Sequence, residues 1–173
     1  PDVVWIKNRD QADSHCLFNV LHGVTVAKHT DGSSAGAADA DTLDAFQSDG
    51  FKVDADVKVN TNTEKYVAWC WKMGTTSGLA GSPSITMVDY SFNQTAGQSI
   101  VQWTGTDSAG TVAHGLGVAP HMFYIPFEGG VVYHHKNTAA PETDYLMMDT
   151  TAATVDNATY FNDTAPTSTL TTV

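Results

Sequence analysis

The sequence contains short, mainly apolar runs, within which side chains alternate between two faces with a period of two residues. No window sustains the spacing of an amphipathic helix. The clearest run is 66–72, in which Val67, Trp69 and Trp71 share one face. Similar runs occupy 3–7, 99–105, 122–125, 131–133 and 145–148. Gly, Asn, Asp and Thr interrupt them at roughly 8–12 residue intervals. This pattern predicts an all-β fold, an antiparallel β-sandwich of the jelly-roll or lectin-like type.

Three local features refine this prediction. Glu128-Gly129-Gly130 lies between two of the apolar runs and predicts a hairpin turn. The helical signal is confined to 41–46, where a single turn is expected. Gly74 to Pro83 is small and polar, which is typical of a linker.

The sequence also contains a weak internal repeat. Residues 1–7 and 120–126 both begin with Pro and continue with apolar or aromatic residues. Downstream, 17–19 lies opposite 133–135, and 43–53 lies opposite 164–173. A period of roughly 119 residues corresponds to a domain rather than to a solenoid turn. We therefore expect a first β unit at 1–88, incomplete at its N-terminus, and a second at 89–173, incomplete at its C-terminus. The alternative is a single sandwich over 1–173.

The charge balance excludes some partners. The chain has 8 basic and 19 acidic residues, a net charge of −11. Nucleic acid binding requires clustered Lys and Arg, so we expect no nucleic acid partner. No apolar stretch reaches the roughly 18 residues of a membrane helix, so we expect no membrane insertion.

The cysteines and tryptophans are expected to be mainly structural. Cys16 and Cys70 are too few for a disulfide scaffold, and nothing in the sequence indicates a bridge between them. Cys70 lies in an apolar run, which predicts a buried thiol. Trp69, Trp71 and Trp103 lie in alternating strands and are expected to form the core.

Several motifs carry a family resemblance. These are residues 1–9, 48–51, 66–72, 114–120 and 164–168. Together they resemble a family of repeated β-rich domains in tailed-phage virion proteins, common in marine phages and usually labelled as tail fibre or structural proteins. The second copy keeps the His-Gly-Leu-Gly-Val-Ala-Pro leader at 114–120 but reads Pro126-Phe127-Glu128 where the first copy has Lys7-Asn8-Arg9. The resemblance implies a virion location and assembly with other virion proteins or with copies of itself. It implies no catalytic residues.

Two groups of residues are candidates for ligand binding. Asp39, Asp41 and Asp44 lie close together, and calcium prefers such hard oxygen ligands, although the spacing is not that of an EF-hand. Apart from this calcium hypothesis, no cofactor is expected. The aromatic residues Trp5, Tyr160 and Phe161 are candidates for stacking on a sugar, and Tyr160 and Phe161 lie in an Asn/Asp/Thr context.

The expected function is therefore structural. No Gly-x-Ser-x-Gly, His-Glu-x-x-His or Walker motif occurs, so we expect no enzyme activity. The leading hypothesis is a non-enzymatic component of a phage virion, such as a tail fibre, an appendage or a capsid-decorating protein. The first alternative is a carbohydrate-binding module that recognises a host-surface glycan. The second is a polysaccharide depolymerase, which would need two carboxylates at a set separation.

Overall fold

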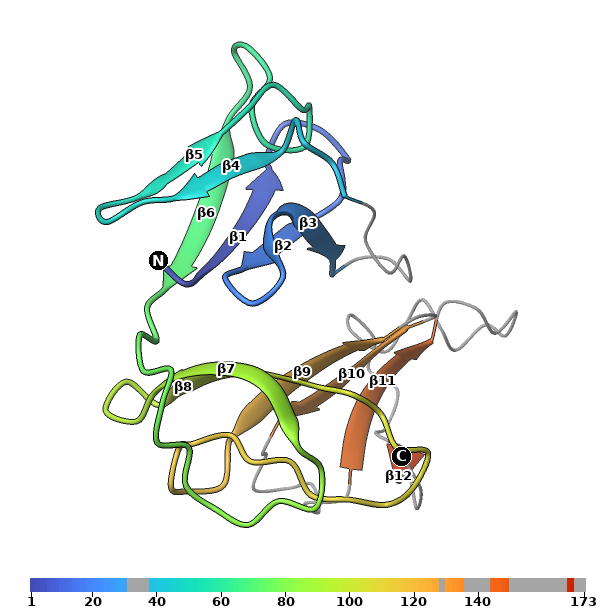
Figure 1. The fold of residues 1–173 in the computed structure, drawn as a ribbon. Coiled ribbons are helices and arrows are strands. Elements are labelled where there is room, and N and C mark those ends of the chain that lie inside the picture. The colour runs from blue at the N-terminus through green and yellow to red at the C-terminus, as the bar shows by residue number, and fades with distance from the viewer. Residues whose placement is uncertain (31–37, 128–129, 136–143, 150–167, 170–173) are drawn as a thin grey trace.

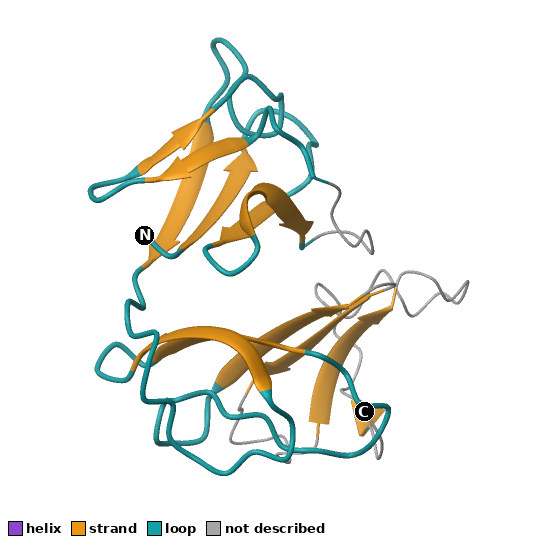
Figure 2. Cartoon of the chain, in the orientation of Figure 1, coloured by secondary structure: helices purple, strands orange, loops and turns teal. Residues whose placement is uncertain are grey.

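The computed structural model describes residues 1–30, 38–127, 130–135, 144–149 and 168–169. These residues form an all-β, antiparallel, sandwich-like fold and contain no helix, as the alternation predicts (Figure 2). The strands are β1 (Val3–Asn8), β2 (Cys16–Asn19), β3 (Gly23–His29), β4 (Leu43–Phe46), β5 (Phe51–Val53), β6 (Tyr66–Trp71), β7 (Met87–Asn93), β8 (Gln98–Trp103), β9 (Met122–Phe127), β10 (Gly130–His135), β11 (Asp144–Asp149) and β12 (Ser168–Thr169).

The first sheet has the strand order β3-β2-β1-β6, with β6 at one edge (Figure 1). β1 pairs along its full length with β6, and Trp5 faces Trp69 in that register. Successive side chains of a strand point to opposite faces. Val4 and Ile6 therefore point to one face of the sheet, while Trp5 points to the other.

The core lies on the Val4 face of this sheet. Its buried residues are Val4, Ile6, Cys16, Phe18, Ala27, Leu43 and Val59. The β4–β5 hairpin contributes Phe46, Phe51 and Val53, which pack against this cluster and form a second layer. The helical turn expected at 41–46 is wrong, because Leu43 is fully buried and pairs with Val53 in an extended ladder. Tertiary burial here outweighs a weak local helical preference.

The chain leaves β6 and soon pairs with β7. Thr75 forms an isolated bridge with Phe92, with backbone hydrogen bonds of 3.0 and 2.9 Å. Phe92 is only 8% exposed. One of its neighbours is Gly115, which has φ +75°, and a Cβ atom there would lie 2.7 Å from the Phe92 ring. The glycine-rich segment after β8 is thus a turn packed closely against β7.

The second larger sheet has the order β12-β11-β10-β9. The hairpin predicted around 128–130 is confirmed by the pairing of β9 with β10, in which Phe127 faces Gly130. β1 and β9 begin at equivalent positions of the sequence repeat. The register is also equivalent, since Trp5 faces Leu17 in the first sheet and Tyr124 faces Tyr133 in the second.

The described strands fall into two groups (Figure 1). Strands β1–β6 and strands β7–β12 share no sheet, although the bridge at Thr75 joins the segment after β6 to β7. The predicted units 1–88 and 89–173 stay a prediction, and a division that follows the sheets comes earlier, between Trp71 and Met87. In the described part of the chain, no helix has the length and apolar character needed to cross a membrane.

Candidate functional site

The outer face of the first sheet carries a cluster of aromatic rings. The Trp5 and Trp69 ring centroids lie 5.5 Å apart with an interplanar angle of 49°, and the Trp5 and His15 centroids lie 6.1 Å apart. The three residues come from β1, β6 and the loop before β2. Tilted rings at these separations attract each other through their quadrupoles. Trp69 is 47% exposed, so this cluster presents an apolar surface to solvent.

The predicted ligand residue Trp5 is thus part of an aromatic surface. Its ring is half-buried, and its indole Nε1 is buried without a hydrogen-bond partner. An unsatisfied buried N–H costs free energy comparable to a lost hydrogen bond. The other two predicted aromatic residues, Tyr160 and Phe161, lie outside the described residues.

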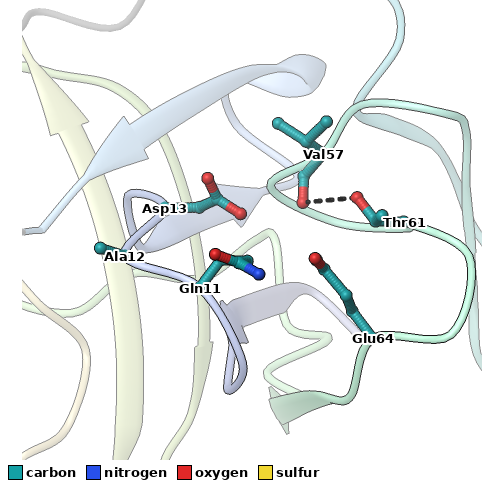
Figure 3. Close-up of a pocket in the computed structure, with 6 residues that line it drawn as sticks. All are labelled: Gln11, Ala12, Asp13, Val57, Thr61 and Glu64. Carbon is teal, nitrogen blue, oxygen red and sulfur yellow. Dashed lines mark hydrogen bonds between the residues drawn. The ribbon is translucent and has the colours of Figure 1, made fainter.

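A pocket of about 420 Å³ lies between two loops of the first unit (Figure 3). Gln11, Ala12 and Asp13 come from the loop between β1 and β2, and Val57, Thr61 and Glu64 come from the loop between β5 and β6. Figure 3 shows the polar side chains of Gln11, Asp13, Thr61 and Glu64 around the same space.

The buried side chain of Asn8 connects the two loops of this pocket. Its side chain is 1% exposed, and its Nδ2 donates to Asp13 Oδ2 at 2.8 Å and to Glu64 Oε2 at 2.6 Å. Its Oδ1 accepts the backbone N–H groups of Asp10 and Gln11 at 3.0 and 3.3 Å. One amide therefore fixes both pocket loops and brings two carboxylates together. No sequence motif indicated this arrangement.

Tyr66 completes the polar network around the pocket. Its hydroxyl donates to the Val57 carbonyl at 2.7 Å and accepts the Thr61 N–H at 2.8 Å. Asn8 Nδ2 also lies 3.2 Å from the same hydroxyl. The hydrogen bonds among these side chains therefore hold the polar groups of the pocket in fixed positions, beside an apolar part of its lining that includes Ala12 and Val57.

The structure does not gather the three predicted calcium ligands as a group with free carboxylates. Lys52 forms an ion pair with Asp44, and Lys58 lies 3.5 Å from Asp39. Within the ranges that the structure describes, no group of three or more His, Cys, Asp or Glu residues could hold a metal ion. Calcium binding by Asp39, Asp41 and Asp44 stays a prediction, and it would have to displace both lysines.

Lys58 makes its closest contact with a different carboxylate, that of Asp56, at 2.7 Å. Burial raises the pKa of Asp56, but the hydrogen bond and charge of Lys58 lower it by more, so this pKa lies below its ordinary value. Burial lowers the pKa of Lys58, and its hydrogen bond and ion pair with Asp56 raise it above its ordinary value. This pair therefore fixes the loop that follows β5.

Two predictions about burial are wrong. Cys70 is a free thiol that is exposed, although it points to the same face as Val4. Trp69 lies on the opposite face and is also exposed, while Trp71 and Trp103 are half-buried and do not belong to the core cluster. Trp69 and Cys70 are exposed because β6 lies at the edge of its sheet. Cys16 is not part of a disulfide and is buried in the core, where its Sγ donates to the Ser14 carbonyl at 3.7 Å.

Comparison with protein families gives one match along the whole chain. Residues 1–173 match the model of a domain of unknown function, DUF7483. No curated protein and no solved structure matches the chain.

Proposed function

The chain belongs to the DUF7483 family of domains of unknown function, and from this premise we propose that it is a non-enzymatic structural component of a phage virion. It serves as a tail fibre, an appendage or a capsid-decorating protein, and it acts by assembly with other virion proteins or with copies of itself. One observation carries this proposal: the edge strand β6 exposes Ala68, Trp69 and Cys70 to solvent.

An exposed edge strand favours assembly for a physical reason. Its outer N–H and C=O groups form a template onto which another strand can add, and soluble proteins usually protect such edges with charges, Pro or bulges. β6 has none of these between Tyr66 and Trp71, and it pairs with β1 without a register shift. An edge of this kind is suited to a permanent neighbour, as in a virion.

The pocket supports a binding role better than a catalytic one. Asn8 occupies one oxygen of Asp13 and one oxygen of Glu64 through the same nitrogen. A retaining glycosidase needs one carboxylate free to attack the sugar and the other free to donate a proton. Both carboxylates here are instead engaged in holding the two loops together.

The test is the location of the chain in an infected culture. Antibodies raised against residues 1–173 are applied to purified particles of a phage that encodes the chain, and bound antibody is detected by immunogold electron microscopy. We expect gold at one defined part of the particle, with none on particles of a phage that lacks the gene. Recovery of the chain only in the soluble fraction, with particles free of it, would contradict the proposal.

Recognition of a host-surface glycan is the second candidate function, and the aromatic cluster favours it. Sugars stack their apolar faces on indole rings, and Trp69 offers an exposed ring beside Trp5. On a glycan array we expect Trp69→Ala to weaken binding roughly 2- to 10-fold, the equivalent of one aromatic contact. Val88→Ala is the matched control, because Val88 is 61% exposed on β7, away from this cluster. Equal binding by wild type and Trp69→Ala would exclude this surface.

A further inference from the structure

The backbone groups of β6 that point away from β1 can be assigned residue by residue. The Arg9 N–H donates to the Lys65 carbonyl at 2.8 Å, and the Asp2 N–H donates to the Trp71 carbonyl at 2.8 Å. In an antiparallel pair, every second residue directs its backbone groups toward the partner strand. Odd-numbered residues of β6 therefore face β1, and Tyr66, Ala68 and Cys70 direct their N–H and C=O groups outward.

These outward groups have no strand beside them in the described part of the chain, where β6 ends the order β3-β2-β1-β6. The three residues also share a side-chain face, and Ala68 and Cys70 are exposed. A small side chain at Ala68 leaves the middle of this edge open. As far as the described strands extend, the edge is thus available from Tyr66 to Cys70, with the least steric hindrance at Ala68.

We propose that β6 pairs in antiparallel orientation with β6 of a second copy of this chain, with the two-fold axis at Ala68. This inference rests on the proposed assembly function and names the partner at this edge. Ala68 then faces Ala68 of the second copy, and Tyr66 faces Cys70 of the second copy. All three outward residues of each strand form hydrogen-bonded pairs, and the two four-stranded sheets join into one.

Charge complementarity selects this register. The pairing places Glu64 of each copy opposite Lys72 of the other copy. This adds two ion pairs, each between a carboxylate and an ammonium group. Glu64 and Lys72 lie just outside the two ends of β6, and each already has a partner in its own chain, Asn8 for Glu64 and Asp2 for Lys72, so each pair across the interface shares its side chains with these contacts. A shift of two residues, with Trp69 at the axis, would place Glu64 opposite Gly74 and would lose both pairs. Opposite charges that face each other across strands are stabilising.

The pairing also explains the exposure of Trp69. In the Ala68-centred register, Trp69 lies opposite Val67 of the second copy, in a non-hydrogen-bonded pair where side chains approach most closely. Both side chains lie on the outer face of the joined sheet, together with Trp5. The interface is isologous, so it closes at two copies and does not continue into a filament by itself.

The experiment measures the mass of the purified chain by sedimentation velocity from 1 to 200 µM. We expect a reversible dimer for the wild type. Ala68→Pro removes only an outward N–H and leaves the ladder with β1 intact, so we expect a folded monomer at all concentrations. Ala68→Lys places two like charges at the axis and is expected to give the same result without altering the backbone. Val88→Lys, on the exposed part of β7, is the control and is expected to stay dimeric.

The register is tested by cross-linking. In a Cys70→Ser background, Ala68→Cys places two thiols opposite each other, and mild oxidation is expected to give a disulfide-linked dimer. The native Cys70 faces Tyr66, so the wild type is expected to give little cross-linked dimer. A monomeric wild type, or a dimer that both Ala68 variants leave intact, would overturn the proposal. Strong cross-linking through Cys70 alone would overturn the register. Immunogold labelling of particles is independent of these results, so a failure of self-pairing is distinguished from a failure of the virion proposal.

Discussion

At the scale of single residues, Asn8 connects loops that are distant in the sequence. Its side-chain Nδ2 donates to both Asp13 and Glu64, and its side-chain Oδ1 accepts two backbone N–H groups. Asn8→Ala removes this hydrogen-bond partner from two half-buried carboxylates and from two backbone N–H groups. We expect a loss of about 2 kcal/mol in the free energy of unfolding, measured by urea titration. Asn60→Ala is the control, because Asn60 is exposed, and it is expected to change stability by less than about 0.5 kcal/mol.

Asp2 makes stability depend on pH. Burial raises its pKa, but the hydrogen bonds from Lys72 and from the Met73 N–H, both at 2.8 Å, lower it by more. The pKa therefore lies below its ordinary value, and the ionised form stabilises the folded chain. This contribution is complete above the unfolded pKa of about 3.9 and is lost as the pH falls through the folded pKa.

The corresponding variant is Asp2→Asn. At pH 7 we expect it to be about 1–2 kcal/mol less stable than the wild type, because it loses hydrogen bonds that involve a charged group. The difference should narrow as the pH falls below about 4, where the wild-type carboxyl becomes protonated. Urea unfolding at pH 7, 5 and 3 measures the difference. A gap of the same size at pH 3 and pH 7 would show that the charge of Asp2 does not contribute.

Sequence reasoning at this scale identified residue types better than their environments. Alternation correctly placed Trp69 and Cys70 on opposite faces of one strand, but it does not reveal which strand lies at the edge of a sheet. Exposure of both residues follows from that edge position. The Asn8 network was also inaccessible, because its partner Glu64 lies in a loop 56 residues away and no local pattern connects them.

At the scale of elements, the turn at Gly115 supports β7 through close contact with Phe92. Gly115→Ala forces an alanine to adopt φ +75° and places its Cβ 2.7 Å from the Phe92 ring. The backbone strain costs about 1–2 kcal/mol, and the overpacking adds about 1–3 kcal/mol. Gly97→Ala is a matched control, because Gly97 has φ +67° and open space around it. Thermal unfolding should therefore show a larger loss for Gly115→Ala, and equal losses would contradict the close packing.

Half of the twelve described strands were predictable from the sequence. β1, β6, β8, β9, β10 and β11 all cover runs whose alternation or β-branched composition indicated them. The sequence repeat is also consistent with the pairing of the strands. Its alignment places Trp5 with Tyr124 and Leu17 with Tyr133, and in the structure Trp5 faces Leu17 and Tyr124 faces Tyr133. β4 was missed because Leu43 to Phe46 is too short for either period to be distinguished, and its burial under the first sheet decides its conformation.

At the scale of the whole molecule, the first unit has a core of its own. Among the residues whose burial the structure describes, every member of the core cluster lies between Val4 and Val59. The two ends of this unit are joined by Asp2, which binds Lys72 and the Met73 N–H. The described contacts between this unit and β7 are few. They are the Thr75 bridge with Phe92, the hydrogen bond from the Gly74 N–H to Ser91 and the hydrogen bond from Asn93 to the Lys72 carbonyl.

We therefore expect a fragment of residues 1–79 to fold without the rest of the chain. Among the described contacts, it retains the core cluster and those of Asp2, and it loses the short pairing with β7. Its urea unfolding, followed by tryptophan fluorescence and circular dichroism, should show one cooperative transition with coincident probes. A fragment of residues 1–64 is the control. It lacks β6, so β1 becomes an edge strand, and Val4 and Ile6 lose their neighbours Cys70 and Ala68. This shorter fragment should therefore be largely unfolded. An unfolded 1–79 fragment would instead indicate that the first unit depends on strands β7–β12 and that the chain folds as one sandwich.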